Sequence, residues 1–303
     1  MLNDEALAAA GLSGATFSPP IGGVVSPIHR AVENICTFAT APGRPPVFVK
    51  HRHADMADFI ALEHVAEASR KAGDLGIAPR LLQADPARGV LVFEALGEEW
   101  AWGHMDVLRR PAVLENLLAA KRAFQKAAPL EETRSVFDLV AAYRELAGGV
   151  ILPAPVRTVL AAVERVAAAI AAAGVDTVPC HADGVSSNVM VGPGNTIRLV
   201  DFEWARQADP AHDLGTVLAE LLPFDGEALL AIEIATGRPD AQVLARARLY
   251  GAADDLMWAL WGFISAARSP RKQVEFFKYA EWRLLRARTV IEGPRFETWL
   301  KQV

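Results

Sequence analysis

Apolar residues along the chain follow two different periods, and these divide it into a strand-rich first third and a helix-rich remainder. Short apolar runs bounded by glycine and proline predict strands at 31–40, 47–50 and 90–94. Apolar residues at helical spacing predict one helix among them, over 55–72. Longer alanine- and leucine-rich patterns predict helices at 111–127, 135–147 and 154–173, and over most of 241–290.

The composition changes near Gly97, where the long helical patterns begin. This change predicts a boundary between an N-terminal lobe of residues 1–96 and a C-terminal lobe of residues 97–303. The first lobe would hold a sheet with one helix, and the second would be mainly helical. We therefore expect an α+β chain, and 303 residues with 52% hydrophobic composition suffice for a large core.

The densest group of polar residues lies at 178–203, where two short β-prone runs flank the turn 192–195. This stretch brings together the side chains of His181, Asp183, Asn188, Asp201 and Glu203. Such a group suits phosphoryl transfer, in which carboxyl or amide oxygens hold magnesium and a further carboxylate accepts the proton of the attacking hydroxyl. The alternative interpretation is a polar hairpin held by its own hydrogen bonds.

The order of these residues favours catalysis. Asp183 and Asn188 are five positions apart, as in the catalytic loop of kinases, and Asp201-Phe202 stands where protein kinases have Asp-Phe-Gly. The third residue here is Glu203. The motif H-x-D-x4-N, β-turn, D-F-E resembles the aminoglycoside phosphotransferase and choline kinase superfamily, and within it most closely the choline/ethanolamine kinases.

The resemblance implies a bilobal protein-kinase-like fold, with an N-terminal antiparallel sheet lobe, and the use of ATP and Mg2+. It assigns catalysis to Asp183, Asn188 and Asp201, with Asp183 as the base. Metal ligands would be Asn188, Asp201 and Glu203. Asp213 would bond the backbone of the catalytic loop, unless it merely caps a helix.

The resemblance also places a nucleotide site in the N-terminal lobe. Segment 21–26 resembles the family's phosphate-covering loop, with Gly22, Gly23 and Ser26, although Pro27 replaces a common asparagine and removes a backbone donor. An ordinary hairpin turn is the alternative for this segment. Lys50, at the end of an apolar strand, would bind the phosphates.

Lys50 needs a carboxylate partner on the following helix to act as a kinase lysine. Glu63 and Glu67 lie one turn apart on one predicted helix face, and we expect Glu63 to be the partner. Adenine would bond the backbone of the linker between the lobes, formed by Phe93, Glu94 and Leu96. Two further tryptophans, Trp100 and Trp102, are expected to pack rather than line a pocket.

A second informative stretch contains Trp258 and Trp261, which are neighbours on one helix face. Two such tryptophans usually belong to a core. Choline kinases, however, carry a W-x-L-W segment followed by a serine turn and an aromatic-rich helix. The resemblance therefore implies that Trp258, Trp261 and Phe276 or Tyr279 surround a quaternary ammonium, which aromatic faces bind well. Glu203 and Asp183 would add negative charge beside the substrate.

Composition excludes several other classes. A net charge of −5 argues against a nucleic-acid partner, and no basic run suggests a membrane surface. The first 14 residues lack the basic and apolar regions of a signal peptide, and the most apolar stretches are shorter than a spanning helix. The two cysteines, Cys36 and Cys180, have no disulfide or zinc spacing. We expect a cytoplasmic protein.

The leading hypothesis is an ATP-dependent kinase that phosphorylates the hydroxyl of choline, ethanolamine or a related amino alcohol. A second hypothesis keeps the fold and the reaction but makes the substrate an aminoglycoside, thiamine or another hydroxylated metabolite. A third, of another class, is a catalytically silent nucleotide-binding regulatory protein, suggested by Pro27 in the glycine loop. The sequence leaves the oligomeric state open.

Overall fold

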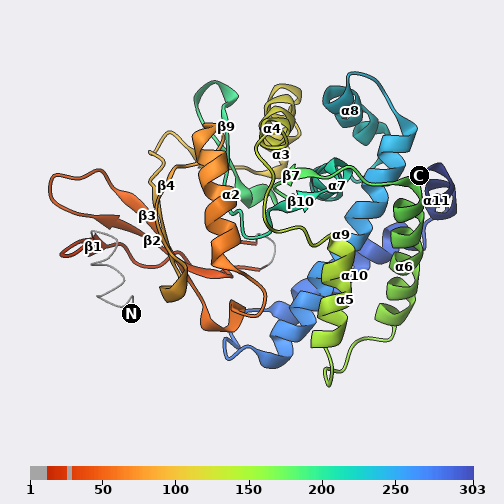
Figure 1. Cartoon of the computed structure of the whole chain (residues 1–303), viewed down its shortest axis with the longest axis horizontal. Helices are drawn as coiled ribbons and strands as arrows, with labels where there is room; N and C mark the ends of the chain where they lie inside the picture. The colour runs from red at the N-terminus through yellow and green to blue at the C-terminus, as the bar shows by residue number, and fades with distance from the viewer. Residues whose placement is uncertain (1–11, 26–28) are drawn as a thin grey trace.

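The N-terminal part of the computed structural model, which describes residues 12–25 and 29–303, is a five-stranded antiparallel sheet (Figure 1). The strands lie in the order β1-β2-β3-β5-β4. Their bounds are β1 Thr16–Phe17, β2 Asn34–Thr40, β3 Val47–Arg52, β4 Leu81–Asp85 and β5 Val90–Glu94. Val49 packs in a small apolar cluster on one face of β3, so its neighbour Lys50 projects from the opposite face.

Helix α2, Leu62–Asp74, packs against this sheet (Figure 1). The predicted helix over 55–72 therefore begins too early. A separate 3-10 turn, Ala54–Met56, comes first, and Ala61 then has an extended backbone (φ −92°, ψ 108°) that keeps it out of the helix. The apolar spacing was correct, because Leu62, Val65 and Ala66 are all buried.

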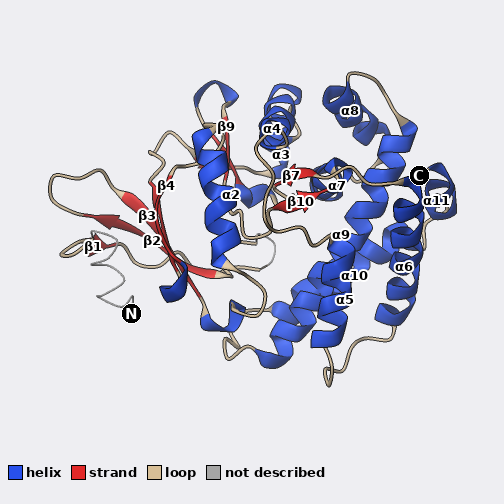
Figure 2. Cartoon of the chain, viewed as in Figure 1, coloured by secondary structure: helices blue, strands red, loops and turns tan. Residues whose placement is uncertain are grey.

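The C-terminal part is mainly helical (Figure 2). The three predicted helices are confirmed as α4 Pro111–Phe124, α5 Val136–Leu146 and α6 Pro155–Ala173. The remaining α-helices are α3 Met105–Leu108, α7 Pro210–Leu221, α8 Asp225–Thr236, α9 Ala241–Arg268, α10 Phe276–Ile291 and α11 Phe296–Gln302. Helix α9 is the centre of this part, since α5, α7 and α10 pack on it and residues 251–265 are all buried.

Two small antiparallel sheets lie between these parts and carry the polar loops. Strand β6, Ala101–Trp102, pairs with β8, Val189–Val191, which pairs with β9, Ile197–Leu199. Strand β7, Val178–Cys180, pairs with β10, Arg206–Ala208. The predicted hairpin is thus formed by β8 and β9, with a left-handed residue, Gly194 (φ 67°), in its turn.

Short 3-10 turns complete the described elements, at Pro86–Arg88, Ser186–Asn188 and Pro193–Asn195. Within the described residues, no helix combines the length and the apolar character needed to cross a membrane.

Candidate active site

The loop between β7 and β8 holds the two polar residues that the kinase-like motif singled out. Asp183 is buried, and its Oδ1 accepts a hydrogen bond from the Val185 amide at 2.7 Å. Its Oδ2 accepts one from Asn188 Nδ2 at 2.8 Å. Burial, and then the nearby charge of Asp201, raise the pKa of Asp183 to about 6 despite these hydrogen bonds. The carboxylate is therefore a stronger base than an exposed aspartate.

A buried ion pair fixes the backbone of this loop. Asp213 on α7 is fully buried, and its Oδ1 accepts from Lys121 Nζ at 2.6 Å and from the Ala182 amide at 3.1 Å. Lys121 also donates to the Asp183 carbonyl at 2.9 Å. The expectation that Asp213 bonds the catalytic loop is confirmed, and its alternative role as a cap is wrong because Asp209 caps α7.

Two residues near the loop between β7 and β8 have a left-handed backbone conformation. Ala182 has φ 54° and Asp201 has φ 70°, values that residues with a Cβ seldom adopt. The His181 ring lies between the two, with Nδ1 3.1 Å from the Asp183 carbonyl and Nε2 3.0 Å from the Val200 carbonyl. Burial and the charge of Lys121 lower the pKa of His181 to about 4, so the ring is neutral near pH 7.

Lys50 joins the sheet to the segment after β9. Its Nζ donates to Asp201 Oδ1 at 2.6 Å and to Glu203 Oε1 at 2.8 Å. Burial opposes the positive charge, but the two carboxylates outweigh it and raise the pKa of Lys50. Burial likewise opposes ionisation of Asp201, yet Lys50 lowers the pKa of that group. The pKa of Glu203 is raised, because it is buried and lies beside the ionised Asp201.

The expected pair of Lys50 with Glu63 is not formed. Glu63 lies on the exposed side of the first turn of α2, whereas Lys50 is directed toward Asp201 and Glu203. Glu67 does not replace it, since its carboxylate accepts from Lys71 Nζ and from the Glu131 amide. Helical spacing predicts that Glu63 and Glu67 share one face of α2. It does not predict whether that face is directed toward Lys50.

The glycine loop is described only in part. Gly23 lies close to the returning chain, because a Cβ at this position would be 2.9 Å from the Ala31 carbonyl oxygen. A Cβ on Gly22 would meet no atom within 4 Å, so its backbone borders open space. A bridge from Val24 to Arg30 closes the hairpin. The predicted contributions of Ser26 and Pro27 lie outside the described residues.

A cavity of about 690 Å3 lies between the sheet and the polar loops. Its lining includes Phe93, Glu94 and Leu96 of the predicted linker. The Glu94 amide already donates to the Arg80 carbonyl at 3.0 Å, so a base would have to use the Glu94 carbonyl or later amides. The lining also includes Lys50, Asn188 and Asp201.

The tryptophans of α9 form a buried aromatic cluster, here defined as Trp258, Trp261, Phe276 and Tyr279. Its rings pack edge to face, with Trp258 and Trp261 centroids 5.2 Å apart. His29 fills the space among them, at 5.3 Å from Trp258 and 5.1 Å from Tyr279. The predicted substrate residues thus meet in space, but around a side chain of the protein itself.

Neither the aromatic cluster nor Asp183 belongs to the cavity lining. The tryptophans are at most 1% exposed. The rings that were predicted to surround a quaternary ammonium instead surround His29, which packs against three of the four rings.

Residues 25–251 match a family model described as the phosphotransferase enzyme family. The chain belongs to this family. The matched range includes Lys50, Asp183, Asn188 and Asp201. No curated protein sequence matches the phosphotransferase.

Solved structures agree on the fold. The phosphotransferase is similar to the choline/ethanolamine kinase family protein from Mesorhizobium loti, with 24% identity and a TM-score of 0.80 over 100% of this chain and 99% of that one. Choline kinase LicA from Streptococcus pneumoniae has 20% identity and a TM-score of 0.79, over 96% of this chain and 97% of that one. Spectinomycin phosphotransferase APH(9)-Ia has 15% identity and a TM-score of 0.63, over 95% of this chain and 97% of that one. The chain therefore has the expected bilobal, protein-kinase-like α+β fold.

The sequence did not point to Arg30, which follows the glycine loop and lines the cavity. Its guanidinium carbon lies 4.4 Å from the centre of the Trp102 ring. Trp100 and Trp102 both line the cavity, and Trp102 is 39% exposed, so the expectation that they only pack is wrong. Tryptophan content alone could not show this, because β6 is too short to be predicted.

Two further polar residues were missed for a similar reason. Asn34 donates to Glu203 Oε1 at 2.8 Å, across a separation of 169 positions. Lys121 was part of an ordinary amphipathic helix pattern, and only the packing of α4 reveals its partner Asp213. Contacts between such distant residues have no local signal in one sequence.

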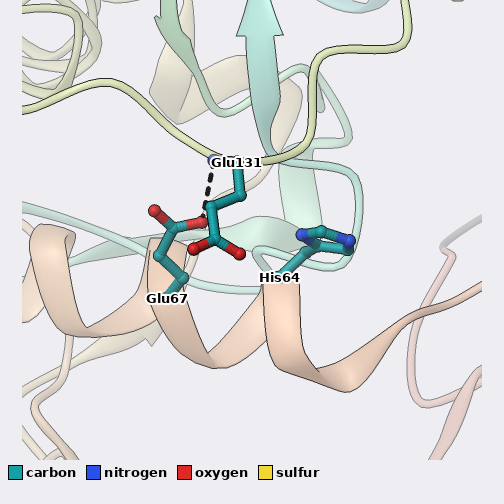
Figure 3. Close-up of side chains that lie close together, drawn as sticks. All are labelled: His64, Glu67 and Glu131. Atoms are coloured by element: carbon teal, nitrogen blue, oxygen red, sulfur yellow. Dashed lines mark hydrogen bonds between the residues drawn. The ribbon is translucent and has the colours of Figure 1, made fainter.

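Figure 3 shows a third polar group, made of His64 and Glu67 on α2 and Glu131 on the loop before α5. Their ligand atoms lie within 4.8 Å of one another. Glu67 already binds Lys71, and none of the three residues lines the cavity. This group therefore plays no part in the reaction considered below.

Proposed function

We propose that this phosphotransferase uses ATP and magnesium to phosphorylate the hydroxyl group of choline, ethanolamine or a related amino alcohol. One observation carries the proposal: Lys50, Asn188 and Asp201 line the same cavity, where Lys50 donates to Asp201, and Asn188 donates to the buried Asp183 just behind the lining. The AMP complex of LicA and the ADP complex of spectinomycin phosphotransferase support a nucleotide in that cavity.

Each residue of the set has a role that its environment supports. Asp183, with its pKa raised to about 6, would orient the acceptor hydroxyl and take its proton near neutral pH. Lys50 would bind phosphate oxygens, and the linker at Phe93, Glu94 and Leu96 would hold the base. Gly22 and Gly23 would bring backbone amides close to the phosphates.

The donor set fits magnesium. Hard oxygen donors are present on Asp201, on Glu203 and on the side chain of Asn188. The side-chain nitrogen of Asn188 donates to Asp183, which leaves its oxygen for the metal. Oε2 of Glu203 is buried and has no partner among the described residues, as suits a metal ligand. Magnesium, when bound, would offset the charge of the phosphates. In its absence Lys50 donates to both carboxylates and offsets one negative charge.

Arg30 extends the proposal on the nucleotide side. Arg30 and Lys50 are the arginine and lysine that line the cavity within the described residues, and Lys50 is already bound to two carboxylates. No described residue accepts a hydrogen bond from the Arg30 side chain, and its Nε is buried without a partner. A guanidinium in this state suits a phosphate oxygen.

The acceptor side rests on charge and aromatic surface. Glu203 and Asp183 are acidic, and the aromatic cluster has the composition that binds alkylammonium groups. That cluster lies beside His29, and the negative charge of Asp183 is one of the causes that raise the pKa of the His29 ring. An amino alcohol has both required groups, a hydroxyl for Asp183 and a cation for the rings.

A second candidate keeps the reaction and changes the acceptor to an aminoglycoside, thiamine or another hydroxylated metabolite. It is favoured by the closed aromatic cluster, which contributes no surface to the cavity. The similarity to spectinomycin phosphotransferase is in keeping with such an acceptor.

We also propose that residues 1–96 bind the nucleotide, that residues 97–303 supply catalysis and acceptor binding, and that the protein is cytoplasmic. The N-terminal sheet carries Lys50 and the linker, while the acidic residues come from the later segments. Cys36 and Cys180 are free and buried, in keeping with a reducing compartment.

A coupled assay of ADP release tests the acceptor directly. The purified protein with Mg–ATP is offered choline, ethanolamine, their methylated relatives, thiamine and a set of aminoglycosides. We expect stimulation by at least one amino alcohol. Stimulation by an aminoglycoside or thiamine alone would favour the second candidate, and no stimulation by any amino alcohol would refute the first.

A further inference from the structure

The His29 ring occupies the centre of the aromatic cluster. Its centroid lies 5.3 Å from Trp258, 5.8 Å from Trp261 and 5.1 Å from Tyr279. These distances are in the range in which an aromatic face attracts a cation. The side chain is only 4% exposed, so the interaction is shielded from water.

Several contacts hold His29 in this position. Nε2 lies 2.7 Å from Glu33 Oε1, and Glu33 is itself buried. The His29 carbonyl accepts a hydrogen bond from Ser187 Oγ at 2.5 Å, which ties it to the residue before Asn188. Nδ1 is buried and has no partner within the described residues. The ring is thus anchored on one side only.

The acidic residues around His29 favour a positive charge on its ring. Burial disfavours the protonated form, but Glu33, Asp183 and Asp201 outweigh burial and raise the pKa of His29. Arg283, on the far side of the cluster, lies 5.3 Å from both the Trp258 and Tyr279 ring centres and is paired with Asp255. The imidazole ring of His29 is similar in size to a methylated ammonium head group and lies among the rings that would surround such a group.

We propose that His29 competes with the cationic group of the acceptor for the aromatic cluster, and so sets how strongly the enzyme binds that acceptor. This inference rests on the proposed function, because it assigns the cluster to an ammonium group. A substrate that uses the cluster must first displace His29, and its apparent affinity is reduced by the cost of that displacement. A neutral acceptor gains nothing from the exchange.

The proposal predicts that removing the ring frees the site. In His29→Ala the cluster and its neighbouring acidic groups remain, while the competing ring is gone. Tetramethylammonium chloride is the simplest probe, because it has the cation and no hydroxyl. By calorimetry on the full-length protein, we expect it to bind His29→Ala at least about tenfold more tightly than the wild type, a difference of about 1.4 kcal/mol.

Two further variants guard against a folding defect. His29→Gln keeps a polar group near Glu33 but lacks the aromatic ring, and we expect a smaller gain in the same direction. His64→Ala removes an imidazole from α2 that makes no ring contact with the cluster within the described residues, and should bind tetramethylammonium like the wild type. Added tetramethylammonium should also raise the melting temperature of His29→Ala more than that of the wild type.

The outcomes separate this inference from the proposed function. Equal or weaker binding by folded His29→Ala and His29→Gln overturns the inference, even if choline is a substrate. Rescue of the His29→Ala melting temperature by imidazole but not by tetramethylammonium would show a core pocket for a ring, and would overturn it too. Tighter tetramethylammonium binding without turnover of any amino alcohol would support the inference and refute the proposed substrate.

Discussion

At the scale of single residues, Arg30 is the sharpest test of the nucleotide site. If it binds the outer phosphates, Arg30→Ala should weaken ATP binding by about tenfold, because a charge-assisted hydrogen bond contributes about 1.5–3 kcal/mol. AMP binding should change little. The measurement is competition with a fluorescent nucleotide, using ATP, ADP and AMP in turn.

Arg198 provides a matched control for Arg30. Its guanidinium lies 5.4 Å from the Trp100 ring, but it does not line the cavity. We expect Arg198→Ala to bind ATP like the wild type. An equal loss of ATP and AMP binding in Arg30→Ala would mean that Arg30 only packs on Trp102 and has no phosphate role.

At the scale of elements, the catalytic loop depends on its close packing against α7. A Cβ on Gly184 would lie 2.2 Å from the Thr216 carbonyl oxygen, so this backbone contact leaves no space for a side chain. Gly184→Ala should therefore shift the loop that carries Asp183 and lower kcat. Forcing atoms into such a contact usually costs about 1–3 kcal/mol of stability.

The control for this prediction lies on α8. A Cβ on Gly226 would meet no atom within 4 Å, and the residue is exposed in the first turn of the helix. Gly226→Ala should keep wild-type kcat and stability or gain slightly. Chemical denaturation and steady-state kinetics on both variants check the pair, and wild-type kcat in Gly184→Ala would contradict the packing argument.

The sequence predicted the elements better than their relations to one another. Strand β5 and helices α4 to α6 follow from apolar period and from proline and glycine at their ends. The order of Asp183, Asn188 and Asp201 was sufficient to predict that they converge, because the short β8–β9 hairpin brings the chain that follows it back beside the chain that precedes it. The Lys50–Glu63 pair failed because it required the orientation of α2, which local pattern does not contain.

The same limit applies to the acceptor site. Tryptophan spacing predicted that Trp258 and Trp261 share a face, and they do contact each other. His29 lies among them because its segment packs against α9. The two residues in contact, His29 and Trp258, are more than two hundred positions apart in the sequence. The residues next to His29 in the sequence do not predict that contact.

At the scale of the whole molecule, Asp55 ties the N-terminal part to the loop before α10. Its carboxylate accepts from Ser269 Oγ at 2.6 Å and from Arg271 Nε at 2.9 Å. We expect Asp55→Ala to lower the free energy of unfolding by about 1–2 kcal/mol, a modest value because the pair is partly exposed and screened. Asp58→Ala, at an exposed position nearby, should have little effect.

The loss should also depend on pH. Burial opposes ionisation of Asp55, but Ser269 and Arg271 lower its pKa below 3.8. Its stabilising contribution is therefore complete above the unfolded pKa and is lost as the pH falls through the folded value. Urea unfolding at neutral pH and below pH 3.8 should show the wild type and Asp55→Ala converging in acid, and a constant difference would contradict this assignment.

The central claim is that Asp183 acts as the base of a phosphoryl transfer to a hydroxyl group, and Asp183→Asn tests it most directly. Once an acceptor has been identified, single-turnover transfer from Mg–ATP should be slowed by about 10²- to 10⁴-fold, the usual contribution of a positioned base. Nucleotide affinity, measured in parallel, should stay within about twofold, since Asp183 does not line the cavity. Transfer at the wild-type rate would contradict the account.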